Sequence, residues 1–573
     1  MCGIIGTIGS KLDRASFEKA RDSLAHRGPD DFGIFIDENA GAMLGHRRLS
    51  IIDLSQAGHQ PMATSDRRYI ITYNGEIYNY LELRDELKGQ YEFKTKTDTE
   101  VLLAAYQVWG EKCLDKFNGM FAFAIWDTHE KKLFAARDRL GVKPFFYHVD
   151  GQKFSFASEI KALLALGVQA MPNENMIFDY LYHGLYDHTN ETFFTGIQSL
   201  APGHYMTWQN GELSTTKYWD AADIKLRQNI DEREARAELV NLLSDSIRLR
   251  FRSDMPVGVN LSSGLDSNSI YHFALKVTGN SLHTFSMCSN TPEYNECELL
   301  NRILSDEQKK YWHTSTLEPE EVIGRIASLN QIQDQPYGGI PTIAYQKMVE
   351  LTKSAGVTVL LEGQGMDELL AGYAYYRNPV SSIALSQDAS QLVQRDVLDV
   401  SFVRRHGARK EVVFPTPFAS DLLNAQYRDM RYTKLPRVLR FNDHATMAHG
   451  RELRLPFLDY RIVEFCFSLP VEYKIRDGRQ KVILRDVMAG IVPEEVQATP
   501  KKGFGAIQTA WFREHLKGKV YAILDSESFK KRPFWDQTKL RESVDAFYSG
   551  KGDNSFFIWQ CFNLEMWFKE YID

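Results

Sequence analysis

A cysteine stands at position 2 of the chain, inside the short apolar run MCGIIG. If Met1 is removed, the α-amine of Cys2, with a pKa of about 7.7–8.0, lies within reach of its own thiol and can accept the thiol proton. Cys2 would then be a nucleophile that needs no histidine neighbour. The same six residues also fit an ordinary buried strand, so the run by itself leaves both interpretations open.

A second chemical pattern lies in the loop LSSGLDS, residues 261–267. Small residues end a predicted strand there, and Ser267 and Asn268 are predicted to open a helix, so that backbone N–H groups converge on a point that suits a phosphate. Asp266 would repel that phosphate unless a divalent cation lay between them, and Mg²⁺ is commonly held by one or two carboxylates together with substrate phosphates. A turn rich in Ser and Gly also has a purely structural explanation.

The segment EGQGMDE, residues 362–368, favours the phosphate interpretation. Asp367 follows a pair of glycines at the carboxyl end of another predicted strand, which is where open α/β sheets bind ligands. Two loops that combine glycine with an acidic residue, on neighbouring strands, predict a nucleotide–metal site.

Two kinds of element must position these residues. Up to about residue 210 the chain consists of short alternating segments, and Asp150-Gly151 between two of them is a hairpin signal, so this half predicts layered antiparallel sheet. The polar stretch 209–230 reads as a linker. A helix is predicted over 231–252, and two strand–loop–helix units over 257–275 and 356–376 have the near-continuous apolar strands of a buried parallel sheet.

The composition excludes several classes of protein. A net charge of −7 and a pI near 6.1 provide no basic field for nucleic acid or for an anionic membrane. The six cysteines lack CxxC spacing, which predicts neither a zinc site nor a disulfide framework. With neither an apolar leader nor an apolar run near about 18 residues, the sequence predicts a cytoplasmic enzyme.

Strings along nearly the whole chain carry a family resemblance. The first half resembles the glutaminase domain of the class II, N-terminal-nucleophile amidotransferases, on MCGIIG, HRGPD (26–30), HRRLSIIDL (46–54), NGEIYN (74–79), KTDTE (96–100) and GMFAFAIWD (119–127). The second half resembles the synthetase domain of glutamine-dependent asparagine synthetase, on SSGLDS, EGQGMDELLAGY, RLPFLDY (454–460) and KVILR (481–485). The implied domains are an α+β glutaminase over 1–210 and an α/β ATP-pyrophosphatase-type synthetase over 211–573.

By this resemblance Cys2 attacks the side-chain amide of glutamine, its α-amine is the base, and a glutamyl thioester forms as ammonia leaves. The oxyanion needs fixed donors, and Asn74 and Gly75 match that role. The resemblance assigns glutamine binding to Arg48, Asn74, Glu76 and Asp98.

The resemblance also implies that a substrate carboxylate attacks the α-phosphorus of ATP, and that ammonia, delivered through a dry internal tunnel, displaces AMP from the acyl-adenylate. Asp266 and Asp367 would hold Mg²⁺. The residues implied for ATP and pyrophosphate are Leu261, Ser262, Gly264, Asp266, Ser267, Met287, Gly363, Gln364 and Lys481. Arg485 lies one helical turn beyond Lys481, and a homodimer is an assembly that the resemblance allows.

Departures from the family pattern concern the acceptor. Asparagine synthetases usually carry SGGLDS and SGEGxDE, whereas this chain has Ser263 in the first loop and both Glu362 and Gln364 in the second. Gln364 replaces a glutamate thought to assist the attack of ammonia, and a glutamine cannot take a proton. The stretch 334–346 also lacks the Thr- and Arg-bearing residues near the amino-acid substrate. We therefore expect an acceptor other than free aspartate, such as a sugar uronate or another biosynthetic carboxylate.

Three other functions stay open at this point. The chain could be an asparagine synthetase proper, in which Gln364 is a tolerated variant. In a glutaminase or a binding protein the second half would be expected to lose its nucleotide-site residues, but Asp266, Asp367 and Lys481 are all present. A β-lactam-forming cyclase would need no ammonia and typically loses the N-terminal cysteine, which is retained here.

Overall fold

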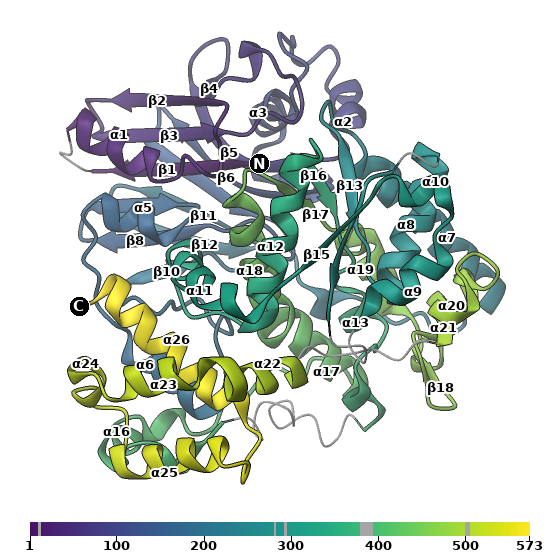
Figure 1. Ribbon diagram of the computed structural model, residues 1–573. Coiled ribbons are helices and arrows are strands. Elements are labelled where there is room, and N and C mark those ends of the chain that lie inside the picture. The colour runs from purple at the N-terminus through teal and green to yellow at the C-terminus, as the bar shows by residue number, and fades with distance from the viewer. Residues whose placement is uncertain (10–12, 280–281, 291–294, 379–392, 499–504) are drawn as a thin grey trace.

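The computed structural model describes residues 1–9, 13–279, 282–290, 295–378, 393–498 and 505–573. Its N-terminal part contains two antiparallel sheets in two layers (Figure 1). The strand order of the first is β10 (Ile197–Ser199), β8 (Phe146–Asp150), β9 (Lys153–Ala157), β1 (Cys2–Ile8), β3 (Ala42–Arg48) and β2 (Asp31–Asp37). The second runs β12 (Glu212–Lys217), β11 (His204–Gln209), β7 (Lys132–Arg137), β6 (Gly119–Asp127), β5 (Tyr69–Ile77) and β4 (Met62–Ala63).

Apolar side chains between the two sheets hold these layers together. Ile4 of β1, Ala122 of β6 and Phe156 of β9 are fully buried in one cluster. The predicted hairpin is confirmed, because β8 and β9 pair antiparallel across Asp150 and Lys153. The stretch predicted as a linker after residue 209 is partly sheet, since β12 pairs with β11 as a polar edge strand. Because the residues of β12 are exposed and polar, they show no apolar alternation that would predict a strand.

The first half also contains helices, of which the first and the fifth pack against the first sheet and the third packs against the second. Their bounds are α1 (Arg14–Asp22), α2 (Tyr80–Glu86), α3 (Asp98–Trp109), α4 (Cys113–Lys116), α5 (Ile160–Ala165) and α6 (Glu174–Phe178). The Thr97 side chain caps α3 by accepting the Glu100 N–H. This cap fixes the first turn of α3, and therefore the position of Asp98, beside β5.

The parallel sheet predicted for the second half is confirmed, and in the structure it has five strands. Their order is β15 (Trp312–Thr316), β14 (Thr284–Cys288), β13 (Val257–Asn260), β16 (Val359–Leu361) and β17 (Glu452–Arg454). The helices around it are α7 (Glu232–Arg250), α8 (Leu265–Thr278), α9 (Glu296–Ile303), α10 (Asp306–Lys309), α11 (Pro319–Gln333), α12 (Ile340–Ser354), α13 (Met366–Leu369), α17 (Asp421–Arg428), α18 (Leu435–Met447), α19 (Tyr460–Ser468), α20 (Val482–Met488) and α21 (Glu494–Ala498).

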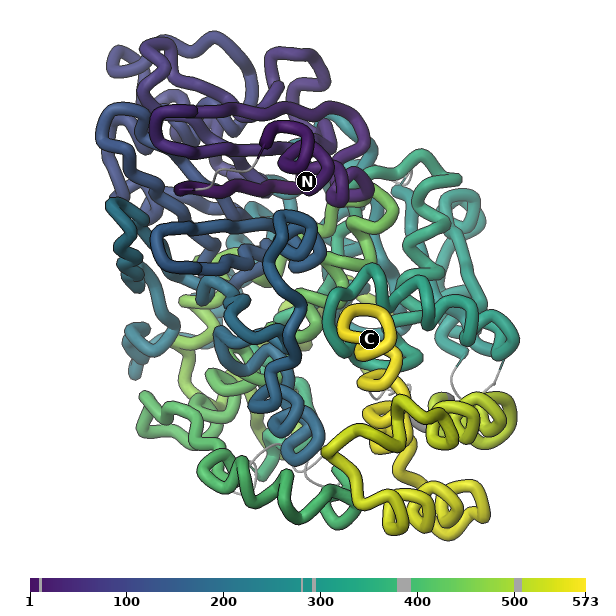
Figure 2. Tube along the Cα trace, turned by 90° about the vertical axis from the view of Figure 1, so that its left-hand side faces the viewer, coloured from purple at the N-terminus to yellow at the C-terminus, as the bar shows by residue number. Residues whose placement is uncertain are grey.

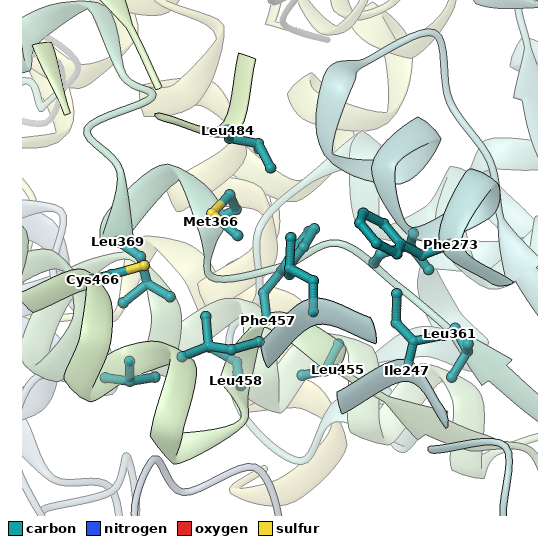
Figure 3. Packing of buried hydrophobic residues seen from close by; sticks show 14 of the residues in the cluster. Ile247, Phe273, Leu361, Met366, Leu369, Leu455, Phe457, Leu458, Cys466 and Leu484 are labelled. Carbon is teal, nitrogen blue, oxygen red and sulfur yellow. The ribbon is translucent and has the colours of Figure 1, made fainter. Parts of the chain in front are cut away.

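One apolar cluster supports both loops that the sequence singled out. Figure 3 shows Phe273 of α8, Leu361 of β16 and Met366 of α13 beside Leu455, Phe457 and Leu458 of the segment after β17. The helix predicted over 231–252 is confirmed as α7, and its Ile247 belongs to the same cluster. Close packing of these buried side chains holds the ends of the strands and the first turns of the helices in fixed relative positions.

The C-terminal helices return to the N-terminal half. They are α22 (Gly505–Trp511), α23 (Lys517–Leu524), α24 (Glu527–Lys530), α25 (Gln537–Tyr548) and α26 (Ser555–Tyr571). Helix α16 (Val400–Arg405) and a small hairpin of β18 (Ile475–Arg476) and β19 (Arg479–Gln480) come earlier in the chain. Figure 2 shows this C-terminal group, in yellow, below the sheets. Trp567 of α26 makes edge contacts with Phe193 and Phe194, so one apolar core joins the two halves.

Among the described residues, no helix combines the length and the apolar character that crossing a membrane requires. The cysteine spacing predicted no disulfide framework, but Cys288 at the end of β14 and Cys297 in the first turn of α9 are joined, with Cα atoms 5.4 Å apart. They are nine positions apart in the sequence, a spacing that marks no motif. The sheet and the helix bring them together.

This disulfide makes a direct prediction about thiol counts. Alkylation of the denatured, unreduced protein is expected to modify the four free cysteines, Cys2, Cys113, Cys466 and Cys561. After reduction all six cysteines of the chain should react. Intact-mass measurement distinguishes the two states, and six modified thiols before reduction would contradict the pairing.

Candidate active sites

The first candidate site surrounds Cys2 at the start of β1. Its pocket is lined by Cys2, Arg48, Gly75, Glu76 and Asp98 among others, so the structure brings together residues predicted from four separate motifs. Burial raises the pKa of the Cys2 thiol, and the nearby N-terminal amine acts in the opposite direction. A base beside the thiol is therefore needed to form the thiolate.

Met1 is present, and its amine lies 3.0 Å from Glu452 Oε2 in a buried ion pair. The nitrogen of Cys2 is consequently a peptide nitrogen here, and it donates to Asn74 Oδ1 at 2.9 Å. The role of the Cys2 α-amine as base stays a prediction that requires removal of Met1.

Asn74 and Gly75 lie next to one another on β5, as the predicted oxyanion donors should. The Asn74 Nδ2 atom is buried and has no hydrogen-bond partner within the described part of the chain, which marks it as a donor available to a ligand. A Cβ on Gly75 would lie 2.3 Å from the carbonyl oxygen of Met120. Only glycine therefore fits this position on the strand.

Arg48 lies opposite Cys2 in the pairing of β1 with β3. Its guanidinium donates to the carbonyl oxygens of Ser55 at 2.8 Å and of Asp53 at 2.5 Å, which fixes the loop that borders the pocket. Part of the hydrogen-bonding capacity of the Arg48 guanidinium is thus used by the backbone. Binding of the glutamine carboxylate by the remaining N–H groups of Arg48 stays a prediction.

Two buried carboxylates face the pocket. Asp98 Oδ2 accepts hydrogen bonds from the Tyr73 hydroxyl at 2.8 Å and from the Ile77 N–H at 3.0 Å. Burial and the neighbouring Asp98 raise the pKa of Glu76, and Glu76 Oε1 is without a partner among the described residues. This pair is suited to an ammonium group, which is what the α-amine of glutamine would present.

The second half contacts a lining residue of this pocket, Glu76, which sequence reasoning missed. Arg454 of β17 donates to Glu76 Oε2 at 3.2 Å and to Glu452 Oε1 at 2.5 Å, with all three side chains buried. Arg454 opens the RLPFLDY motif, so a signal was present, but the sequence did not show what the arginine contacts.

The second candidate site is a cavity of about 800 Å³ at the carboxyl ends of β13 and β16. Its lining includes predicted residues of three motifs: Ser262, Gly264, Asp266, Ser267, Gly363, Gln364, Asp367 and Lys481. Helix α8 begins at Leu265 rather than at the predicted Ser267, after Gly264 in an extended conformation. Asp266 therefore lies in the first helical turn.

Lys481 joins the two acidic loops. Its Nζ lies 2.7 and 2.6 Å from the carboxylate oxygens of Asp266 and 2.7 Å from Asp367 Oδ1. Burial opposes the charge of Lys481, but the two aspartates outweigh burial and raise its pKa. A Cβ on Gly372 would lie 1.9 Å from Asp367 Oδ1 and 2.3 Å from Lys481 Cε, so this glycine makes room for the contact.

The oxygens of Asp266 and Asp367 converge on one point, which fits the ligand chemistry of Mg²⁺ with substrate phosphates. Among the described residues there is no cluster of three or more His, Cys, Asp or Glu side chains arranged to hold a metal. A metal at this point would therefore take its other ligands from the nucleotide and water, and metal binding by Asp266 and Asp367 stays a prediction.

Other predicted residues have different surroundings. Leu261 is buried in the apolar core, and neither it nor Met287 lines the cavity. The guanidinium of Arg485 donates to the backbone carbonyls of Gln480, at 2.9 Å, and Gln497. Glu296 also lines the cavity and accepts the Ser263 N–H at 3.2 Å. Glu296 lies in none of the motifs that predicted the site, so the sequence contained no signal for it.

Two family models match separate parts of the chain. The family model described as "Glutamine amidotransferase domain" matches residues 1–219, and the model described as "Asparagine synthase" matches residues 238–569.

Three relatives illustrate the similarity. Asparagine synthetase [glutamine-hydrolyzing] 1 of Bacillus subtilis is 30% identical, covering 99% of this chain and 97% of the relative. Putative asparagine synthetase [glutamine-hydrolyzing] 2 of Methanocaldococcus jannaschii is 38% identical over 66% of this chain and 76% of its own length. Amidase chry2 of Gibberella zeae is 26% identical over 93% of this chain and 91% of the relative.

Proposed function

Because the chain belongs to the asparagine synthetase family and is a glutamine-hydrolysing amidotransferase of that kind, we propose that it amidates a carboxylate other than free aspartate. Glutamine is hydrolysed at Cys2, and the ammonia is used in the second cavity. There an ATP-dependent step converts the acceptor carboxylate to an acyl-adenylate and releases pyrophosphate.

The observation that carries this proposal is the distribution of charge in the second cavity. Lysine and arginine side chains of its lining are Lys481, Arg377 and Arg485, and Lys481 is already paired with two aspartates. Glu362, Gln364, Leu435 and Val438 also line the cavity and provide no positive charge. A second anionic group on the acceptor would lie unpaired against them, at a cost of several kcal/mol.

Each predicted residue would have a separate role in one of the two sites. Asn74 and Gly75 would donate to the oxyanion at Cys2, and Glu76 with Asp98 would bind the ammonium of glutamine. Lys481 would neutralise the pyrophosphate leaving group. Mg²⁺, held by Asp266 and Asp367, would supply further charge neutralisation when bound.

Aspartate is the second candidate acceptor, because relatives at 30% and 38% identity are named asparagine synthetases. Within the stretch 334–346, Tyr345 donates to Glu362 at 2.5 Å, and no cation from that stretch lines the cavity. Of the cations that line the cavity, Arg377 and Arg485 are the ones that would have to bind the aspartate α-carboxylate.

Steady-state kinetics test the choice of acceptor. With glutamine, ATP and Mg²⁺ present, AMP release is measured across a panel that contains aspartate, sugar uronates and simple monocarboxylates. We expect aspartate to be at least ~10²-fold poorer in kcat/KM than the preferred acceptor. If aspartate gives asparagine and AMP with kcat/KM near 10⁴ M⁻¹s⁻¹ or above, a typical enzyme value, the chain is an asparagine synthetase.

A further inference from the structure

Glu362 is a buried carboxylate that forms no ion pair within the described part of the chain. It is 1% exposed and lines the second cavity. Its four hydrogen-bond donors are all neutral: Asn260 at 3.1 Å, Tyr345 at 2.5 Å, Gln364 at 2.7 Å and Asn442 at 3.3 Å. Buried charges in proteins are normally paired or bound to a ligand. Asp266 and Asp367 in the same cavity follow that rule through Lys481, whereas Glu362 does not.

The Gln364 side chain is oriented by this carboxylate. An ionised carboxylate only accepts hydrogen bonds, so the amide nitrogen of Gln364 must face Glu362 and the amide oxygen must face away. That oxygen, Oε1, is buried and has no partner among the described residues, and Gln364 lines the cavity. The pair thus presents acceptors and a negative charge to a ligand that donates N–H groups.

The same region is connected to the glutamine pocket. The Glu362 N–H donates to the Arg454 carbonyl oxygen at 3.1 Å, and the Arg454 side chain contacts Glu76. On α18, Asn442 contacts Glu362 while its neighbour Asp443 accepts from Arg27 at 2.8 Å. Glu362 therefore lies where elements that contact the first half reach the second cavity.

We propose that Glu362 and Gln364 receive the ammonia in the synthetase step: Gln364 Oε1 accepts one of its N–H groups, and Glu362 balances the positive charge that nitrogen gains on attack. This proposal rests on the proposed function. The nitrogen lone pair forms the C–N bond, the carbonyl carbon–oxygen bond to AMP breaks, and AMP leaves with that electron pair. The proton lost from nitrogen passes to Glu362 and from there to water.

The electrostatic setting is compatible with this role. Burial raises the pKa of Glu362, against the effect of its hydrogen-bond donors. The ionisable side chain that contacts Glu362 is the Tyr345 phenol, whose own pKa is raised by burial and by Glu362. This phenol is not a cation, so a positive nitrogen is the partner that would relieve the unpaired charge.

The test separates the two half-reactions of the synthetase cavity. ATP–pyrophosphate exchange with the preferred acceptor reports adenylation, and amide formation from ammonium salts reports the second step. Glu362→Gln is expected to lose amide formation by at least ~10²-fold more than it loses exchange, the range for removal of one acid–base group. Glu350→Gln is the matched control, because Glu350 is 39% exposed and paired with Arg325 on the surface.

A second variant guards against a simple folding defect. Glu362→Gln combined with Gln364→Glu exchanges the two ends of the 2.7 Å hydrogen bond and keeps one acid in the pair. We expect it to recover at least ~10-fold of the amide formation lost in Glu362→Gln.

Three results would overturn the proposal. The first is amide formation by Glu362→Gln at the rate of the unaltered protein. The second is equal loss of both half-reactions in both variants, which indicates a structural support. The third is a rise in KM for the acceptor alone, which indicates that the pair binds an amino group of the acceptor. If the unaltered protein shows no exchange with any carboxylate, the proposed function itself fails.

Discussion

Cys2→Ala is expected to abolish glutamine-dependent amide synthesis and to leave synthesis from ammonium salts largely intact. Alanine removes the sulfur that would carry the glutamyl group, and the remaining oxyanion donors cannot replace a nucleophile. The second cavity is lined by none of the residues around Cys2. The two activities should therefore separate, with a loss of at least ~10³-fold confined to the glutamine-driven reaction.

Glutamate release and amide formation are measured side by side, with glutamine or with ammonium chloride as the nitrogen source. Cys113→Ala serves as the control, because Cys113 is another buried free cysteine of the first half and lies away from the pocket. A folded Cys2→Ala protein that is equally inactive with ammonium would refute the separation into two sites. Intact mass of the unaltered protein shows whether Met1 has been removed.

Local sequence patterns predicted the elements that short-range physics determines. The Asp150-Gly151 hairpin forms because its turn residues accept the backbone angles required, with Gly151 at φ +58°. The apolar strands of the second half formed a parallel sheet because both faces are covered by helices. Strand β12 was missed because an exposed edge strand has no apolar face to reveal it.

In the candidate sites, too, the sequence motifs identified residues but not the contacts between residues that are far apart in the chain. Motifs identified Asp266, Asp367 and Lys481, but not that one amine contacts both carboxylates. Residues 378 positions apart, Glu76 and Arg454, meet in one hydrogen bond, and no periodicity encodes such a contact. The sequence showed Glu362 as a departure from the family pattern in the second loop. Its four neutral donors come from separate parts of the chain and became visible only in the fold.

Asp266→Asn and Asp367→Asn are each expected to reduce pyrophosphate release by at least ~10²-fold. Each change removes one negative charge from the point where Lys481 and a metal would meet the phosphates. It also leaves Lys481, now beside a single carboxylate, free to shift from the position set by its 2.6 and 2.7 Å contacts. Basal glutaminase activity at Cys2 should persist, because no residue of this cluster lines that pocket.

The measurement follows pyrophosphate release in the presence of acceptor and ATP while Mg²⁺ is titrated. Replacing a residue that holds the metal should raise the Mg²⁺ concentration needed for the half-maximal rate. Replacing a residue that only positions Lys481 should lower the rate at every Mg²⁺ concentration. Asp525→Asn is the matched control, since Asp525 is 57% exposed and paired with Arg541 at the surface. Unchanged pyrophosphate release in a folded variant would remove that aspartate from the site, and an unchanged Mg²⁺ requirement would remove it from the metal while keeping it beside Lys481.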